Sequence, residues 1–113
     1  MSKAVMIERY RSNGHGHIAT VLPGPWPQVV AIVPAYNEER FIGSVVLKTK
    51  QYVDTVIVID DGSSDATAEI AEAAGAIVVR HRRNQGKGHA LNTGFQRARE
   101  LAPQAMVLMD RTG

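Results

Sequence analysis

The chain has 113 residues, of which 44% are hydrophobic and 21% are charged, and its formal net charge is +2. This length allows one domain, the composition is that of a globular protein, and the small net charge gives no reason to expect a nucleic-acid partner. The chain has no cysteine, which excludes disulfides and thiolate metal sites. No apolar run approaches the roughly 20 residues that span a bilayer, and no secretory leader is visible, so we expect a cytoplasmic protein.

Residues 1–28 differ in character from the rest, because they contain three of the five prolines. Segments 4–7 and 18–22 fit short strands, whereas 23–27 fits neither a helix interior nor a central strand, since proline lacks the backbone N–H. The two histidines within 14–17 fit either a metal site or a polar loop. We interpret residues 1–28 as an arm or linker and 29–113 as the domain.

From residue 29 onward, short apolar runs alternate with amphipathic stretches. The runs predict four buried strands, at 29–33, 56–59, 76–79 and 105–109. The stretches after the first three runs predict helices, the last one spanning about 86–101 and stopped by Pro103. This alternation predicts an α/β fold with three layers: a parallel sheet of about four strands in the order 3-2-1-4, with helices on both faces. We expect a ligand crevice at the switch point between strands 1 and 4.

Residues with known end preferences flank the predicted helices. Asn37 is a suitable N-cap for the first helix, and Ser63 or Ser64 for the second. Gly75 is suited to stop the second helix, because glycine readily adopts the left-handed conformation that ends helices.

A polar cluster follows the first strand at residues 34–39. One interpretation is a strand-to-helix turn, in which Pro34 ends the strand and Glu38 favours the positive end of the helix. The other is a ligand site, because Tyr36 offers a flat surface on which a base can stack. The two interpretations remain open on the residues alone.

A second cluster, at residues 60–65, holds three carboxylates directly after the second strand. Asp60 ends an apolar strand, where an unpaired carboxylate is costly to desolvate. It fits a contact to a base or ribose, or a place in a metal site, although a hard cation needs more oxygen ligands than are visible.

A glycine-flanked lysine, Lys87, opens the third predicted helix. Backbone N–H groups at a helix start bind anions, so this position suits a phosphate; a solvated loop is the alternative. Four basic residues lie close together and invite the same two interpretations: Arg80, Arg82, Arg83 and Lys87. The neighbouring His81 and His89 are expected to be solvated.

Three ordered motifs, at 33–39, 58–65 and 83–94, resemble glycosyltransferase family 2, and the resemblance spans about 29–110. The branch that makes dolichyl- or polyprenyl-phosphate sugars is the most similar. The resemblance implies a Rossmann-like GT-A fold that binds a UDP- or GDP-sugar and transfers its hexose to an acceptor such as polyprenyl phosphate, at a membrane surface in the full-length protein. It implies that Lys87 lies near the donor phosphates and that a further set of residues lines the base and ribose pocket: Pro34, Ala35, Tyr36, Glu38, Asp60 and Asp61.

The chain departs from the family pattern after the fourth strand. The family has an Asp-x-Asp motif that binds a divalent cation, Mg²⁺ or Mn²⁺; here Asp110 matches the first acid and Thr112 stands at the second. We therefore expect an amino-terminal part of a transferase that binds nucleotide weakly and is inactive, with no catalytic base to name. We also expect an exposed fourth strand at 107–109 that promotes self-association.

The sequence leaves room for two other functions. A non-catalytic nucleotide-binding or interaction module derived from the same fold fits the short length and Thr112. A dinucleotide-dependent oxidoreductase fits poorly, because segment 34–39 has none of the glycines that the Gly-x-Gly-x-x-Gly fingerprint requires.

Overall fold

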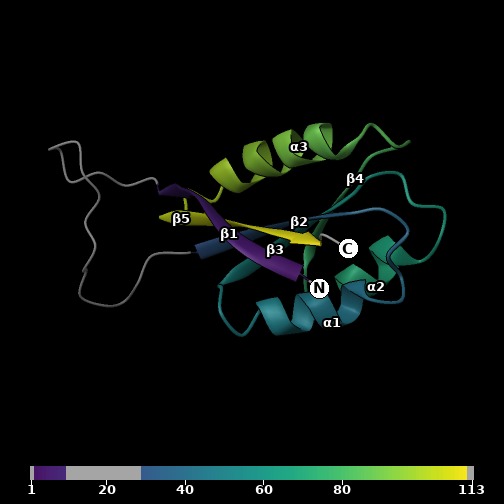
Figure 1. Ribbon diagram of the computed structural model, residues 1–113, viewed down its shortest axis with the longest axis horizontal. Coiled ribbons are helices and arrows are strands. Elements are labelled where there is room, and N and C mark those ends of the chain that lie inside the picture. Colours follow the sequence, from purple (N-terminus) through teal and green to yellow (C-terminus); the bar gives the residue numbers. More distant parts are fainter. Residues whose placement is uncertain (1, 10–28, 112–113) are drawn as a thin grey trace, which may run out of the picture.

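The computed structural model describes residues 2–9 and 29–111, which form one sheet with helices on both of its faces (Figure 1). In chain order the elements are β1 (Ser2–Arg9), β2 (Val29–Ala35), α1 (Ile42–Thr49), β3 (Thr55–Asp60), α2 (Thr67–Ala73), β4 (Ile77–Arg80), α3 (Lys87–Arg99) and β5 (Ala105–Arg111). The strand order across the five-stranded sheet is β1-β5-β2-β3-β4. No helix in these described segments is long and apolar enough to cross a membrane.

The predicted parallel sheet is confirmed. Strands β4, β3, β2 and β5 are parallel neighbours, and this is the predicted order 3-2-1-4. Figure 1 shows α3 on one face of the sheet and α1 and α2 on the other, so the three layers are also as predicted. Each βαβ unit returns to a parallel strand through a helix, which is what this alternation of elements requires.

The N-terminal strand β1 changes the prediction for the sheet edge. It pairs antiparallel with β5, from Ser2 opposite Arg111 to Arg9 opposite Ala105. The expected exposure of the strand at 107–109 is therefore wrong: β5 has a neighbour on each side, and Val107 is only partly exposed. The rest of the proposed arm, residues 10–28, lies outside the described residues.

Two apolar layers fill the space between the sheet and its helices. Val30 and Ile32 of β2 face α3, whereas Ala31 and Val33 face α1 and α2. Both faces of the central strands are covered, which explains why their sequences are continuously apolar rather than alternating. Gly94 of α3 allows close approach to the sheet, because a Cβ there would lie 2.5 Å from Cγ2 of Ile32.

The helix ends agree with the sequence at one position and differ at two. Gly75 follows α2 with a φ of +104°, as predicted for the residue that stops it. Helix α1 begins at Ile42, well after Asn37, whose φ of +51° places it in the left-handed region. Helix α2 begins at Thr67, so neither predicted serine is its N-cap. The polar residues of both loops have other partners, described below.

Candidate functional site

A cavity of about 280 Å³ lies at the carboxyl ends of β2 and β3, beside the start of α3. It is lined by Pro34, Ala35, Tyr36, Glu38, Asp61, Asn84, Gly86, Lys87 and Ala90. Three segments that are distant in sequence therefore meet at one edge of the sheet, where open α/β folds bind ligands. Among the β5 residues whose side chains are described, 105–109, none lines this cavity. A second, small cavity between α1 and β5 shares Pro34, Ala35 and Glu38 with it and includes Met109.

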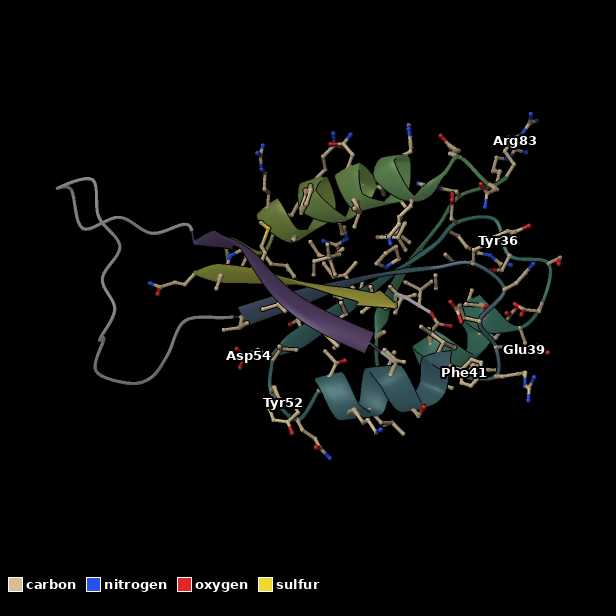
Figure 2. The ribbon with its side chains drawn as sticks, in the orientation of Figure 1. Tyr36, Glu39, Phe41, Tyr52, Asp54 and Arg83 are labelled. Carbon is tan, nitrogen blue, oxygen red and sulfur yellow. The ribbon has the colours of Figure 1, made fainter. Side chains whose placement is uncertain are left out.

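Six of the seven residues predicted for nucleotide binding line the larger cavity: Pro34, Ala35, Tyr36, Glu38, Asp61 and Lys87. Tyr36 is half exposed, at 49%, and in Figure 2 it lies at the end of the molecule opposite Tyr52 and Asp54. An exposed ring on a cavity wall can stack against a flat ligand. The sequence interpretation did not name Asn84 or Ala90.

Strand β2 opens toward the cavity because its pairing with the two neighbouring strands ends at different points. It pairs with β3 as far as Ala35, but with β5 only as far as Ile32. The Ala35 carbonyl accepts a hydrogen bond from the Asp61 N–H, so the backbone of Pro34 points the other way, toward β5. Proline has no N–H to leave unpaired there. The strand thus runs through Pro34 instead of ending at it as predicted.

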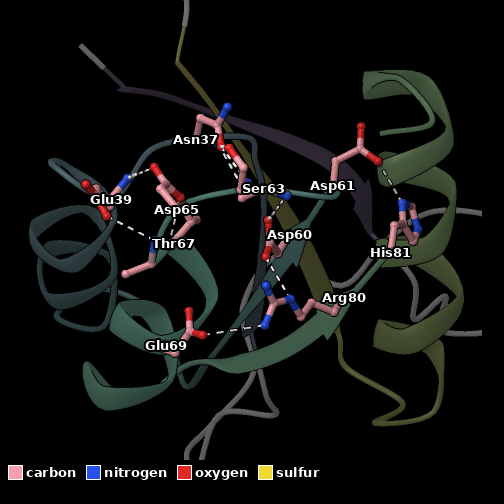
Figure 3. Close-up of polar contacts among 12 residues, drawn as sticks. Asn37, Glu39, Asp60, Asp61, Ser63, Asp65, Thr67, Glu69, Arg80 and His81 are labelled. Carbon is pink, nitrogen blue, oxygen red and sulfur yellow. Dashed lines mark hydrogen bonds and ion pairs between the residues drawn. The ribbon is translucent and has the colours of Figure 1, made fainter. Parts of the chain in front are cut away.

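Asp60 does not line the cavity, although it was predicted to contact the ligand. Its side chain is buried on the α1 and α2 face of the sheet, and its Oδ1 accepts a hydrogen bond of 3.1 Å from the Ser63 N–H. Its Oδ2 lies 3.3 Å from Nε of Arg80, close enough for an ion pair but without hydrogen-bond geometry in the described structure (Figure 3). Alternation along β3 explains the difference, because consecutive side chains point to opposite faces.

Asp61 binds the loop that precedes α3. Oδ1 accepts hydrogen bonds from Nδ1 of His81 (2.8 Å) and from the Gln85 N–H (2.9 Å), and Oδ2 accepts one from the Gly86 N–H (2.9 Å). Burial by itself would raise the pKa of the Asp61 carboxyl, but these hydrogen bonds outweigh it and hold the pKa below its ordinary value of 3.8. The carboxylate is therefore ionised at neutral pH.

The hydrogen bonds to Asp61 occupy the N–H groups of Gln85 and Gly86, which precede α3. The phosphate position expected at the start of α3 depends on the N–H groups of the first helical turn, and it stays a prediction. The loop contributes Asn84, Gly86 and Lys87 to the cavity wall.

His81 is largely buried and was wrongly expected to be solvated. Its side chain is 9% exposed, and its Nε2 lies 2.9 Å from Oγ1 of Thr93 in α3. The ring of His89 meets it edge-on, with 5.4 Å between centroids. The short strand β4 ends immediately before His81, and no local pattern in the sequence marks this position as buried.

The loops after β2 and β3 are joined by reciprocal hydrogen bonds (Figure 3). Asn37 donates its N–H to Oγ of Ser63 (2.8 Å) and accepts the Ser64 N–H at Oδ1 (2.9 Å). Glu39 accepts the Ala66 N–H (3.0 Å) and thereby satisfies a free donor at the start of α2. These polar residues hold the two loops together, and the sequence had suggested helix caps instead.

Asp65 and Thr67 continue this connection. Asp65 accepts the N–H groups of Glu39 and Thr67 and the Thr67 hydroxyl. Partial desolvation acts to raise the pKa of the Asp65 carboxyl, but the hydrogen bonds from Thr67 and Glu39 lower it below 3.8 overall. The Thr67 Oγ1 also accepts the Glu38 N–H at 2.8 Å, next to the cavity wall.

The backbone of Gly62 packs directly against the loop before α3. Its φ is +79°, and a Cβ there would lie 2.4 Å from the backbone of Arg83 and of Asn84. Only glycine fits without displacing this loop.

The four basic residues that lie close together in the sequence, at positions 80–87, have different surroundings in the structure. Arg80 lies beside Asp60 and Glu69 on the α2 side of the sheet, with 3.7 Å between Nη1 of Arg80 and Oε2 of Glu69. Arg82 and Arg83 are exposed and do not line the cavity. Of these four residues, Lys87 is the one that lines the cavity.

The described residues do not assemble a metal site. No group of three or more His, Asp or Glu side chains among them lies close enough to hold a metal ion. Asp110, the predicted metal ligand, stands in β5 opposite Lys3 of β1, and Thr112 lies outside the described residues. One carboxylate is too few for Mg²⁺ or Mn²⁺, so the side chains that the structure describes do not by themselves complete a cation site.

Comparison with known proteins identifies relatives of this chain. Two relatives are an uncharacterized protein of Methanocaldococcus jannaschii, 42% identical over 88 residues, and the UDP-N-acetylglucosamine–dolichyl-phosphate N-acetylglucosaminyltransferase of Methanococcus voltae, 34% identical over 104 residues. The matches cover 76% and 75% of this chain, but only 36% and 41% of the two relatives. The chain therefore spans about two fifths of their length.

A solved structure shares the fold. Glucosyl-3-phosphoglycerate synthase of Mycobacterium tuberculosis, determined in complex with Mn²⁺, UDP and glucosyl-3-phosphoglycerate, has a TM-score of 0.51 and 37% identity, over 57% of this chain and 27% of that one. The sequence profile described as "Glycosyl transferase family 2" matches residues 30–110, from the start of β2 nearly to the end of β5. The chain thus belongs to glycosyl transferase family 2.

Proposed function

We propose that residues 29–113 form the nucleotide-sugar-binding half of a hexosyltransferase. The donor is a UDP- or GDP-linked hexose, and the acceptor in the whole protein is a lipid phosphate such as a polyprenyl phosphate. The dolichyl-phosphate acceptor in the name of the Methanococcus voltae relative and the UDP in the Mycobacterium tuberculosis structure support these two assignments. A lipid acceptor would bring the whole protein to a membrane surface from the cytoplasm.

The observation that carries the proposal is the meeting of Tyr36, Asp61 and Lys87 on one cavity. An aromatic face, a carboxylate and a cation next to one another match the three parts of a nucleotide, which are a flat base, hydroxyl or N–H donors, and phosphates. Asp61 lines the cavity while three hydrogen bonds hold it, so it can accept a further donor in a fixed orientation. We assign Tyr36 to the base, Asp61 to a base or ribose donor, and Lys87 to the phosphates. Pro34, Ala35 and Glu38 form a further part of the wall.

A divalent cation has a limited place in this proposal. The described residues do not complete a cation site, and Asp110 is the residue that we assign to one. In the family a cation offsets the negative charge of the departing diphosphate. We expect the 113-residue chain to bind nucleotide weakly and to catalyse no transfer, because it spans only about two fifths of the length of these relatives.

The proposal is tested by calorimetric titration of the chain with UDP and GDP, each with and without Mn²⁺. We expect weak binding of one nucleotide. Tyr36→Ala should weaken it by about 1–3 kcal/mol, the range for one base stacked on an aromatic ring. Lys87→Ala should weaken it by roughly tenfold, since it removes a charged partner of the phosphates.

Lys48→Ala is the matched control. It also removes one lysine charge, but from the last turn of α1 on the other face of the sheet. If the folded chain binds neither nucleotide at millimolar concentration, or if Lys48→Ala weakens binding as much as Lys87→Ala, the proposal is wrong.

A non-catalytic nucleotide-binding or interaction module is the second candidate. Thr112, which stands where the family has its second metal-binding acid, favours it. Titration with and without Mn²⁺ separates the two. If Asp110 and the nucleotide phosphates hold a cation together, Mn²⁺ strengthens nucleotide binding, whereas the module binds nucleotide equally well in both conditions. Self-association through the C-terminal strand is not part of either proposal, since β1 occupies that side of β5.

A further inference from the structure

The side chain of His81 uses both ring nitrogens to connect the end of β3 with α3. Nδ1 lies 2.8 Å from Oδ1 of Asp61, and Nε2 lies 2.9 Å from Oγ1 of Thr93. The side chains of Asp61 and His81 are both largely buried, at 6% and 9% exposure respectively. The His81 backbone is also fixed, because its N–H donates to the Asp60 carbonyl at 2.9 Å.

The direction of these hydrogen bonds follows from the chemistry of the partners. An ionised carboxylate can only accept, so Nδ1 of His81 must carry a hydrogen and donate it to Asp61. The hydroxyl of Thr93 can donate or accept, so it can bond to Nε2 whether or not that nitrogen carries a hydrogen. Both ends of the imidazole are therefore held.

The Asp61 carboxylate that His81 orients also binds the backbone at the edge of the cavity. The same Oδ1 that accepts from His81 accepts the Gln85 N–H, and Oδ2 accepts the Gly86 N–H. Gly86 directly precedes Lys87 and has a φ of +95°. Any rotation of the Asp61 carboxylate would thus release the backbone that presents Lys87.

We propose that His81 is a positioning residue of the cavity: its Nδ1 donor fixes the Asp61 carboxylate, which in turn fixes the Gln85–Gly86 backbone and the start of α3. His81 does not line the cavity and touches no ligand. Its effect on nucleotide affinity rests on the proposed function, whereas its effect on the loop does not.

Two substitutions that separate the ring nitrogens test this inference. The amide nitrogen of asparagine can take the place of Nδ1 and still donate to Asp61, whereas that of glutamine reaches the place of Nε2, near Thr93. We expect His81→Ala and His81→Gln to weaken UDP or GDP binding by about tenfold, as for a lost hydrogen bond to a charged group, and His81→Asn to restore most of the affinity.

The loop itself provides a readout that needs no nucleotide. Hydrogen exchange of the Gln85 and Gly86 amides, followed by NMR, should be faster in His81→Ala and His81→Gln than in His81→Asn. His89→Gln is the control, because His89 contacts the His81 ring only edge-on and is exposed. It should leave both amides as protected as in the original chain.

The outcomes distinguish this inference from the proposed function. If the unmodified chain binds no nucleotide, the proposed function fails, and amide exchange still decides the role of His81. Equal exchange at Gln85 and Gly86 in the asparagine and glutamine variants would mean that His81 only fills space, and would overturn the inference. The comparison uses two variants with similar side chains, so it holds even if the alanine variant is unstable.

Discussion

At the scale of single residues, the two consecutive carboxylates after β3 have different surroundings and different roles. Asp60 is buried against Arg80 on the α2 side, whereas Asp61 faces α3 and the cavity. A strand turns successive side chains to opposite faces, so adjacent positions in a motif need not share a site. We therefore assign ligand binding to Asp61, and to Asp60 the structural role of pairing with Arg80.

The lowered pKa values of Asp61 and Asp65 predict how stability depends on pH. Both pKa values lie below 3.8 in the folded chain, so both carboxylates stabilise the fold fully above that value. This contribution is lost as the pH falls below 3.8 and through the lowered pKa values. Asp61→Asn should therefore cost stability at pH 6 and less at pH 3, measured by urea unfolding.

Glu72→Gln, on the exposed side of α2, is the control for this prediction. It also removes one carboxylate and should change stability little at either pH. A deficit of Asp61→Asn that is equal at pH 6 and pH 3 would contradict the proposed source of the stabilisation.

At the scale of elements, the cavity depends on how closely α3 approaches the sheet. Gly94 lies against Ile32 of β2, and Ala90, one turn earlier, forms part of the cavity wall. Two glycines of the same helix have opposite surroundings, since a Cβ on Gly88 would meet nothing within 4 Å.

Alanine at these two glycines should therefore have opposite effects. Gly94→Ala places a methyl group 2.5 Å from Ile32 and should destabilise the fold by about 1–3 kcal/mol, as overpacking does in other cores. Gly88→Ala should be neutral or stabilising by up to about 1 kcal/mol, because alanine favours helix. Thermal and urea unfolding measure both, and a Gly94→Ala variant as stable as Gly88→Ala would show that α3 can shift away from the sheet at no cost.

At the scale of the whole molecule, β1 completes the sheet beyond the family core. The family profile begins at residue 30, yet β1 pairs with β5 along most of its length. Without it, β5 would present unpaired N–H and C=O groups along an edge, which invites pairing with another chain.

Deletion of residues 1–28 should thus increase self-association, because it uncovers β5. Sedimentation velocity over a range of concentrations measures this against the full chain, and circular dichroism verifies that the shortened chain is folded. If the folded deletion variant remains as monomeric as the full chain, β1 does not protect this edge.

Much of this structure was predictable because its signals are local. Apolar runs and helical spacing mark β2 to β5 and α1 to α3, and the alternation of the elements yields the parallel order. The same order places the loops after β2, β3 and β4 at one sheet edge, so the cavity and the position of Tyr36 and Lys87 on its wall were expected from the sequence.

The remaining features depend on contacts between distant segments. The spacing of apolar residues within one segment carries no information about such contacts. The sequence by itself determined the layers, the strand order and the edge that carries the cavity. Only the tertiary structure decided that β1 pairs with β5, that Asp60 faces away while Asp61 binds the loop, and that His81 is buried between that carboxylate and Thr93. The physical reason is that a side chain's hydrogen-bond partners are set by which backbones fold next to it, and these partners come from elements that are far away in the chain.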